Sequence, residues 1–262
     1  MSWSKYAPLV RVRNQLARLA RTINGLVWPP RSLITGELVE GPGLIEPEYW
    51  RMLDFVTAPL CIRCGAPFEA YLGEAADADQ SCAACIAKPP AYDRARAALA
   101  YSDVSRDLIL PLKYAGRRDG LALMASWTVN AGKELCDDAE LIVPIPLHYT
   151  RLARRGFNQA GWLAAAISRQ TGVPLSVDAL KRVRATPTQA GKSARGRRRN
   201  VAGAFSVRRP KRVKDRRILL VDDVFTTGAT VEACAKVLRR AGAVSVDVVT
   251  VARVVRPADG LI

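Results

Sequence analysis

Residues 218–230 read Ile218-Leu-Leu-Val-Asp222-Asp223-Val-Phe-Thr226-Thr227-Gly228-Ala229-Thr230. The apolar half predicts a buried β-strand, and two adjacent carboxylates, Asp222 and Asp223, stand at its end. A turn of small and hydroxyl-bearing residues follows, and a helix begins after it. In open α/β sheets ligands bind at the carboxyl ends of the strands, so this stretch predicts a binding site as well as a strand.

The turn after the two carboxylates suits a phosphate group. Its successive backbone N–H groups, its hydroxyls and the N-terminus of the following helix all favour an anion. The carboxylates cannot favour that anion, but they suit sugar hydroxyls beside it. The combination therefore predicts a ribose 5-phosphate. The stretch contains neither the Gly-Lys-Ser/Thr sequence of a Walker loop nor a dinucleotide-binding fingerprint.

The chain on both sides of this stretch alternates between apolar strands and amphipathic helices. Continuous apolar strands separated by helices indicate parallel pairing in an α/β sheet. Residues 185–200 lack apolar periodicity and are expected to be mobile, whereas residues 31–60 are rich in glycine and proline and predict loops. The predicted strands are 94–101, 141–146, 216–224 and 245–254, and the predicted helices are 108–114, 119–135, 158–170 and 230–243.

Composition and charge exclude several classes of protein. Hydrophobic residues make up 49% of the chain, which excludes disorder for most of it. No run of about 18 apolar residues is present to span a membrane. The N-terminal segment is interrupted by arginines and lacks the apolar core of a secretory signal, so we expect a cytoplasmic protein. The formal net charge of +16 indicates an anionic partner.

Most of the excess positive charge lies in one block. Residues 181–217 contain 15 basic residues and one acidic residue, Asp215, for a net charge of +14. Its position directly before the strand that carries Asp222 indicates phosphate or nucleic-acid binding, and a solvated basic loop is the plain alternative. Residues 1–31 add six basic residues and no acid. Within them, residues 8–27 have the spacing of an amphipathic helix, which we expect to dock on the protein rather than on a membrane.

Four cysteines form two Cys-x2-Cys pairs, Cys61 with Cys64 and Cys82 with Cys85, separated by 17 residues. Each pair can direct two sulfurs at one ion, and four thiolates suit a tetrahedral structural Zn²⁺. Disulfides are the alternative, but nothing in the sequence indicates an oxidising compartment. A redox pair would need only one of the two motifs. The spacing therefore predicts a zinc module.

A weaker repeat precedes the cysteines. Residues 30–40 align with residues 59–69 at an offset of 29, with three of eleven positions identical. Ser32 and Thr35 then fall where the first two cysteines stand, and residues 46–49 are a counterpart of the second pair. The segment is either a degenerate zinc module without its ligands or a chance similarity, and both interpretations stay open.

Further motifs lie in a fixed order around these features: Leu112-Lys113-Tyr114-Ala-Gly116, Val143-Pro-Ile-Pro-Leu-His148, Arg155-Gly-Phe-Asn-Gln159, Gln189, Arg197, Asn200 and Gly203-Ala-Phe205. Residues 218–230 resemble the phosphoribosyl pyrophosphate (PRPP) motif of type I phosphoribosyltransferases. Together with the cysteines, the whole set from 59 to 253 resembles the ComF family of competence-associated proteins. The resemblance implies a type I phosphoribosyltransferase-like α/β fold, with a parallel sheet flanked by helices and a small N-terminal four-cysteine zinc module. It divides the chain into an N-terminal helix with a degenerate zinc-like segment (1–58), a zinc ribbon (59–92) and a phosphoribosyltransferase-like domain (93–262).

The resemblance also implies a role for each part of the site. Asp222 and Asp223 would bind the ribose hydroxyls as the catalytic pair, and the segment from Val143 to His148 would form the pyrophosphate loop. The mobile loop 185–200 would close over the site with its arginines, which suit a departing pyrophosphate. Mg²⁺ would be held chiefly by the oxygens of the ligand and by water. The predicted PRPP contacts are Thr226, Thr227, Gly228, Ala229, Thr230, Val143, Pro144, Ile145, Pro146, Lys113, Arg155, Asn158, Gln159, Gln189 and Arg197.

Single residues leave alternatives open. His148 is either a general base or a residue that orders its loop. Lys113 contacts phosphate or is a solvated lysine at a helix end. Asn158 contacts substrate or caps the helix that follows it. Lys192 and Gly196 stand where the family usually has a leucine and an acid, so the mobile loop is more basic here.

Two functions agree with these expectations. One is an enzyme that binds PRPP with Mg²⁺ and transfers the phosphoribosyl group to an unknown acceptor. The alternative is a non-catalytic, PRPP- or nucleotide-responsive protein of DNA uptake, with single-stranded DNA and DNA-uptake proteins as partners; a nucleotide-sensing regulator on the same fold is a variant of it. The fold alone cannot decide between them. A phosphorylated sugar is the first ligand to test and DNA the second.

Overall fold

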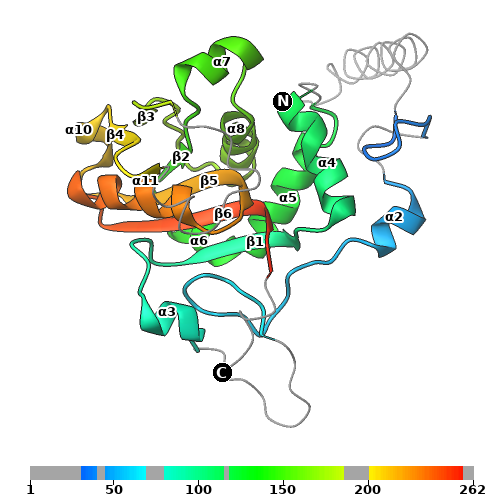
Figure 1. Cartoon of the computed structure of the whole chain (residues 1–262), viewed down its shortest axis with the longest axis horizontal. Helices are drawn as coiled ribbons and strands as arrows, with labels where there is room; N and C mark the ends of the chain where they lie inside the picture. Colours follow the sequence, from blue (N-terminus) through cyan, green and yellow to red (C-terminus); the bar gives the residue numbers. More distant parts are fainter. Residues whose placement is uncertain (1–30, 40–44, 69–79, 115–117, 186–200, 256–262) are drawn as a thin grey trace, which may run out of the picture.

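The computed structural model describes residues 31–39, 45–68, 80–114, 118–185 and 201–255. At its centre lies a parallel four-stranded sheet with helices on both faces (Figure 1). The strand order is β1-β6-β5-β2. The strands are β1 (Ala95–Ala100), β2 (Leu141–Pro144), β5 (Arg217–Phe225) and β6 (Ser245–Arg253). The fold class predicted from the sequence is thus confirmed.

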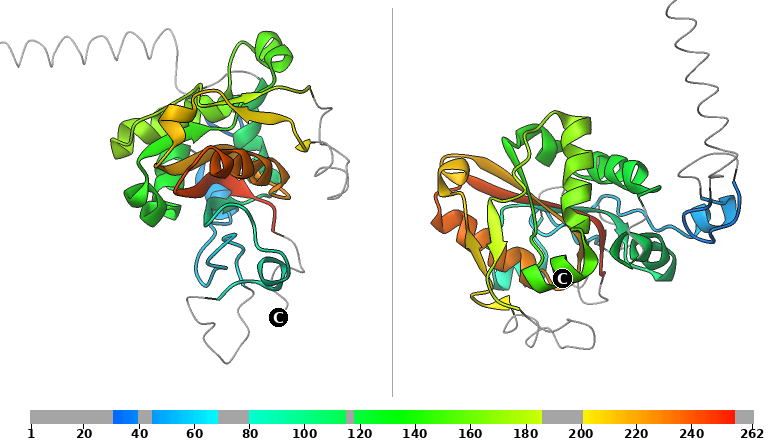
Figure 2. Two further views of the ribbon diagram at one scale, coloured as in Figure 1. Left: turned by 90° about the vertical axis from the view of Figure 1, so that its left-hand side faces the viewer. Right: turned by 90° about the horizontal axis from the view of Figure 1, so that it is seen from above.

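Alternate residues of β5 serve the two faces of the sheet. Leu219 and Val221 belong to the core formed with α4, α5 and α8, whereas Ile218 and Leu220 belong to the core formed with α11. Figure 2 shows the green helices α5 and α8 and the orange helix α11 on opposite sides of the sheet. Burial on both faces explains why the strand is apolar without alternation. The helices are α4 (Asp103–Tyr114), α5 (Leu121–Ala131), α6 (Lys133–Asp138), α8 (Gln159–Thr171) and α11 (Ala229–Arg240).

The predicted strands and most predicted helices are found within a few residues of their expected bounds. The helix expected over 119–135 is wrong in one respect, because Gly132 divides it into α5 and α6. A Cβ at Gly132 would lie 2.6 Å from Cγ1 of Val249, so the backbone approaches β6 too closely for a side chain. This close contact is long-range and leaves no local signal in the sequence.

Several short elements were not predicted. They contain three to seven residues, too few to establish a period. For the described residues between 31 and 60, which exclude 40–44, the expectation of loops is correct except for one of these helices. They are α2 (Pro47–Arg51), α3 (Ala83–Ala87), α7 (Tyr149–Arg155), α10 (Pro210–Val213) and the antiparallel pair β3 (Leu180–Arg182) and β4 (Phe205–Val207).

Some expectations lie outside the described residues. These are the amphipathic helix over 8–27 and nearly all of the loop 185–200, including Gln189 and Arg197. Within the described ranges, none of the helices has the length and apolar character needed to cross a membrane.

Arg94 connects the start of β1 to β6. Asp247 in β6 is only 4% exposed, and its two oxygens accept hydrogen bonds from Nε and Nη2 of Arg94 at 3.1 and 2.6 Å. The same Nη2 also donates to Asp138 at 2.7 Å. Because a buried carboxylate is costly without a partner, Arg94 makes the charge at Asp247 tolerable.

Replacing Arg94 by Met should lower the free energy of unfolding by about 2–4 kcal/mol, because Asp247 is left buried without its partner. The double variant R94M/D247L should recover part of this loss. Urea unfolding followed by circular dichroism measures both. The control Arg106→Met removes exposed pairs with Asp103 and Asp107 and should cost much less than Arg94→Met. Equal losses at Arg94 and Arg106 would contradict this account.

Candidate functional site

Three segments that are far apart in the sequence meet at Asp223. This residue near the end of β5 is 7% exposed. Its Oδ2 lies 3.2 Å from Nζ of Lys113, in the last turn of α4, and accepts a hydrogen bond of 3.2 Å from Nε2 of Gln159, the first residue of α8. A buried carboxylate needs such partners. Lys113 is therefore an ion-pair partner inside the site and not a solvated lysine at a helix end.

Asp222 differs from Asp223 in its surroundings. Its Oδ1 accepts a hydrogen bond of 2.9 Å from the backbone N–H of Asp223. Burial, followed by the neighbouring Asp223 carboxylate, raises the pKa of Asp222 to about 8. Burial lowers the pKa of Lys113, but the charge and the hydrogen bond of Asp223, together with the charge of Asp222, outweigh it and the net shift is upward. The raised pKa of Asp222 favours its protonated form beside the ion pair of Asp223 with Lys113.

The turn after β5 has the geometry expected of an anion site. Gly228 has φ +68°, and a Cβ there would lie 2.8 Å from Cζ of Phe225, so the turn requires glycine. The twelve-residue helix α11 begins at the next residue, and its first turn directs backbone N–H groups at the space above the turn. The hydroxyl oxygen of Thr227 is buried and makes no hydrogen bond with the described residues. A buried hydroxyl of this kind is ready for a ligand.

The predicted pyrophosphate loop begins directly beside β5. The N–H of Ile145 donates to the carbonyl of Val221 at 2.9 Å. Asn158 donates from Nδ2 to the carbonyl of Ile145 at 3.1 Å, and its Oδ1 accepts from the N–H of Ala160 at 3.2 Å. Asn158 therefore caps α8 and also holds the loop. Its contact with a substrate stays a prediction.

The side chains of this loop are mostly turned into the protein. Val143, Pro144 and Ile145 are buried, so a ligand at the loop would meet backbone groups. His148 is 5% exposed, caps α7 and has its Nδ1 2.8 Å from Oγ1 of Thr150. The geometry supports the interpretation of His148 as the residue that orders the loop.

Basic side chains lie around the carboxylates. Nη1 of Arg155 donates to Oε1 of Gln159 at 3.4 Å, which connects Arg155 through Gln159 to Asp223. Arg182 of β3, which the sequence analysis did not single out, influences the pKa of Asp222 through its charge. Burial, followed by the nearby Arg151, lowers the pKa of Arg182. Arg182 belongs to the basic block 181–217. Because the short strand β3 could not be predicted, nothing in the sequence indicates that Arg182 lies at the site.

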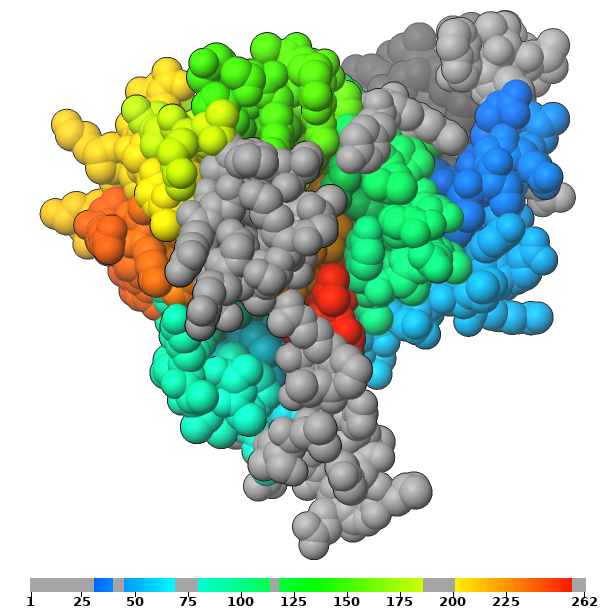
Figure 3. Space-filling model, viewed as in Figure 1, coloured from blue at the N-terminus to red at the C-terminus, as the bar shows by residue number. Residues whose placement is uncertain are grey.

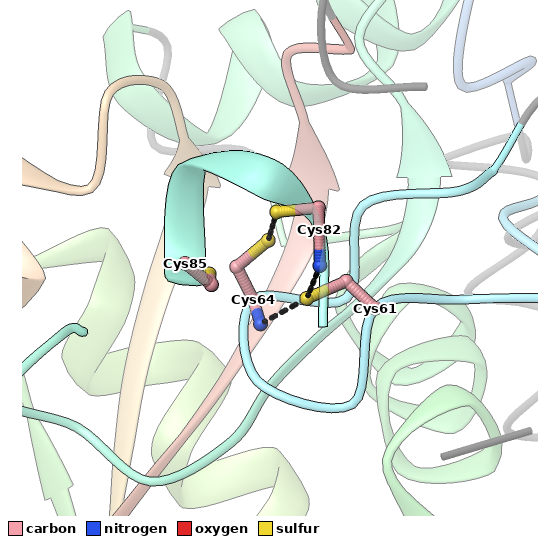
Figure 4. Close-up of side chains that lie close together, drawn as sticks. All are labelled: Cys61, Cys64, Cys82 and Cys85. Carbon is pink, nitrogen blue, oxygen red and sulfur yellow. Dashed lines mark hydrogen bonds between the residues drawn. The ribbon is translucent and has the colours of Figure 1, made fainter. Parts of the chain in front are cut away.

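The four cysteines converge on one point. Their Sγ atoms all lie within 4.8 Å of one another, and those of Cys64 and Cys82 are 3.7 Å apart. Bonds of about 2.3 Å to a tetrahedral Zn²⁺ would place sulfurs about 3.8 Å apart. Backbone N–H groups of Cys64 and Cys82 donate to Sγ of Cys61 at 3.5 and 3.2 Å (Figure 4). The cluster, with Cys85 in the middle of α3 as its fourth member, is compatible with a structural zinc.

The four-cysteine segment is attached to the sheet through its backbone. Nη1 of Arg253, at the end of β6, donates to the carbonyl of Cys64 at 2.6 Å. The N–H of Ala95, at the start of β1, donates to the carbonyl of Arg63 at 2.6 Å. Gly65 has φ +67°, and a Cβ there would lie 2.3 Å from the carbonyl oxygen of Ala95. Figure 1 accordingly shows α3 below β1.

Comparison with known proteins agrees with this geometry. The family model described as "Phosphoribosyl transferase domain" matches residues 152–259, which contain β5, the turn and α11. The chain thus has a phosphoribosyltransferase-type domain.

Relatives cover most of the chain. Competence protein F of Haemophilus influenzae is 34% identical over 201 residues, which are 74% of this chain and 85% of that protein. DNA utilization protein YhgH of Escherichia coli K12 is 35% identical over 197 residues, 72% and 82% of the two chains. Competence protein ComFC of Bacillus subtilis is 29% identical over 160 residues, 60% and 63% of the two chains. The chain belongs to the ComF family.

Asp222→Asn should become more stable than the wild type as the pH rises. The pKa of Asp222 in the folded protein, about 8, lies above the ordinary value of 3.8, so protonation of this carboxyl favours the folded state. Its contribution to the free energy of unfolding is fully present below pH 4 and is lost as the pH rises through 8. Urea unfolding near pH 4 should give nearly equal free energies for the two proteins. At pH 8.5 the variant should be more stable by at least about 1.4 kcal/mol, the equivalent of one pKa unit. A difference that does not change with pH would refute the raised pKa.

Proposed function

We propose that the chain binds PRPP together with Mg²⁺ at the carboxyl edge of β2 and β5 and transfers its phosphoribosyl group to an acceptor. One observation carries the proposal: a carboxylate pair and a glycine-dependent turn at a helix N-terminus follow each other at the end of one buried parallel strand. The turn 226–230 suits the 5-phosphate, and Asp222 and Asp223 suit the adjacent ribose hydroxyls. The match to the phosphoribosyl transferase domain supports this assignment.

The surroundings of the two carboxylates support different tasks. Asp222, with its raised pKa, holds a proton at neutral pH and can donate a hydrogen bond to a ribose oxygen. Asp223 is charged beside Lys113 and can accept one. As the bond from C1 to the pyrophosphate oxygen breaks, negative charge grows on the leaving group. Lys113, Arg155 and Arg182 are the described cations around this edge that would stabilise it.

Two metal ions belong to the proposal. Mg²⁺ would neutralise the pyrophosphate and would be held mainly by oxygens of the ligand and by water. Asp222 and Asp223 are the only acids among the described residues at the adjoining end of β5. One Zn²⁺ would be held by Cys61, Cys64, Cys82 and Cys85, whose spacing suits a closed structural site. The zinc would keep the segment folded against β1 and β6.

A second candidate function is single-stranded DNA binding in DNA uptake, with PRPP as a regulatory ligand. The printed names of the relatives, competence protein F and DNA utilization protein, support it. So does the surface around α10, where Arg208, Lys211, Arg212 and Lys214 are all exposed. Exposed cations of this density bind the phosphate backbone, and such binding weakens steeply with salt.

Calorimetric titration with PRPP and Mg²⁺ tests the proposed ligand. We expect the double variant Asp222→Asn/Asp223→Asn to bind at least about tenfold more weakly, since each substitution changes a hydrogen bond to the ribose. The matched control Asp137→Asn/Asp138→Asn replaces two adjacent acids on α6 and should bind like the wild type. Equal affinity in all three proteins would remove the carboxylate pair from the binding site.

Consumption of labelled PRPP in the presence of candidate acceptors then separates the two functions. Consumption that depends on Asp222 and Asp223 supports transfer. Tight binding of PRPP without consumption, combined with salt-sensitive binding of single-stranded DNA, supports the second candidate.

A further inference from the structure

A cavity of about 520 Å³ lies between the four-cysteine segment, α11 and the turn after β5. Figure 3 shows α3 and the residues that follow it, in teal, against the orange surface of α11. The volume falls in the range of about 300–1,000 Å³ that is typical of ligand sites. The cavity begins at Thr226 to Ala229 and extends along α11 as far as Arg240. Along a helix, the 12 residues from Gly228 to Arg240 span about 18 Å.

The middle of the cavity is apolar and partly aromatic. Tyr92, Phe205 and Phe225 contribute rings, and Pro89 and Pro90 contribute flat apolar surface. The rings of Tyr92 and Phe225 are held edge to face at 6.1 Å. Fixed aromatic and proline surfaces suit a planar ring of the ligand, because stacking requires no particular hydrogen bonds.

The two ends of the cavity favour anions. One end is the turn with its helix N-terminus and the buried hydroxyl of Thr227. The other carries Lys88, Lys236 and Arg240. The acid among the described lining residues is Glu232, whose oxygens accept from the N–H of Ala91 at 2.8 Å and pair with Lys236 at 3.0 Å. The cavity therefore combines an apolar middle with an anion site at each end.

We propose that this cavity binds the 5′-phosphorylated end of a single-stranded nucleic acid. The terminal phosphate would occupy the turn, a base would lie among the aromatic rings, and the next phosphates would meet Lys88 and Arg240. A span of about 18 Å gives room for the terminal phosphate, a base and the phosphates that follow it. The proposal rests on the second candidate function and gives it a location. It also predicts that the 5′ end of the nucleic acid competes with PRPP, because both place a phosphate on the same turn.

Charge reversal at the distal end is the first test. The probe is a 5′-phosphorylated oligothymidylate of about ten nucleotides, with binding followed by fluorescence anisotropy. Lys88→Glu/Arg240→Glu should weaken binding at least about tenfold. The matched control Lys133→Glu/Arg169→Glu makes the same change on α6 and α8, outside the cavity, and should weaken it less than about threefold. Equal weakening by both double variants would place the strand on the general basic surface and overturn the proposal.

Filling the cavity is the second test. Ala233→Trp on α11 places an indole in the cavity and should abolish probe binding, whereas Val244→Trp at an exposed position outside it should not. PRPP with Mg²⁺ should displace the probe, and removal of its 5′-phosphate should weaken it at least about tenfold. Binding that is indifferent to Ala233→Trp and to the 5′-phosphate overturns the inference. If salt-sensitive DNA binding persists in that case, the second candidate function survives without this site.

A separate observation concerns residues 31–46. Residues 31–38 repeat the backbone geometry of residues 60–67, which begin the four-cysteine segment. Arg31 forms an antiparallel bridge with Leu38, just as Leu60 does with Pro67, at an offset of 29 in both strands of the bridge. The same offset relates Gly36, with φ +77°, to Gly65, with φ +67°.

The hydrogen bonds inside the two loops also correspond. The N–H of Ser32 donates to the carbonyl of Glu37 at 2.7 Å, and the N–H of Cys61 donates to that of Ala66 at 2.8 Å. In the first loop, the N–H of Thr35 donates to Oγ of Ser32 at 3.1 Å. At the corresponding position of the second loop, the N–H of Cys64 donates to Sγ of Cys61. Chance similarity in sequence does not produce four matching backbone features at one offset.

A carboxylate takes the place of the metal in the first loop. Oε2 of Glu46 accepts a hydrogen bond of 2.7 Å from Oγ of Ser32, and Oε1 accepts one from Oγ1 of Thr35. Ser32 is fully buried. We infer that residues 31–38 together with Glu46 form a metal-free copy of the first cysteine knuckle. The side chain of Glu46 binds Ser32 and Thr35, the two positions that correspond to the metal-binding Cys61 and Cys64.

Hydrogen exchange of the full chain, with and without a chelator, tests this inference. Chelation should expose the amides of residues 61–68 and leave those of Ser32 and Thr35 protected. Glu46→Ala should do the reverse, while Glu48→Ala serves as the matched control. Metal analysis of the purified protein should give one zinc per chain. Two zinc ions per chain, or protection of Ser32 and Thr35 that Glu46→Ala leaves unchanged, would overturn it.

Discussion

The burial of one negative charge organises the candidate site. Asp223 lies at the end of a strand that is covered on both faces, where a lone carboxylate would lose most of its hydration. It is retained because α4 supplies Lys113 and α8 supplies Gln159, so both helices must end or begin at this edge. Burial, followed by the neighbouring Asp223 carboxylate, raises the pKa of the adjacent Asp222 far above its ordinary value. Helix placement and the positions of the cations are consequences of the same constraint.

A second connection joins the four-cysteine segment to the site. Arg253 donates to the carbonyl of Cys64, and its guanidinium lies 5.6 Å from the ring centre of Phe225, the last residue of β5. Phe225 in turn packs under Gly228, where a side chain would collide with its ring. The four-cysteine segment therefore supports the turn through two contacts, and unfolding of this segment would disturb the turn without touching the carboxylates. This arrangement gives the segment a role in the site beyond its own folding.

The sequence could predict those features that local pattern determines. The apolar run before Asp222, the small residues of the turn and the cysteine spacing each have a period or a chemistry that survives without tertiary context. Lys113 and Gln159 could each be predicted as site residues, but their contacts with Asp223 could not, because these contacts depend on how α4 and α8 pack. The role of Arg182 could not be predicted because its strand, β3, has only three residues. The break at Gly132 could not be predicted because its cause is close contact with Val249, which is distant in the sequence. The repeat at residues 31–39 could be suggested from three identities and from the alignment of residues 46–49 with the second cysteine pair, but the hydrogen bonds of Glu46 with Ser32 and Thr35 could be found only in the structure.

The net charge of +16 serves several physical tasks. Part of the basic charge forms ion pairs at the surface, where Arg209 pairs with Asp178 and Arg217 lies beside Glu140. Another part is buried near the carboxylates, where low polarity makes each charge effective at short range. The remainder is exposed around α10, where salt screens it beyond about 8–10 Å. Exposed charge of this kind attracts a polyanion to the surface but cannot align it. Alignment requires the buried cations and the rigid turn, which is why the location of the charge indicates more about the ligand than its sum.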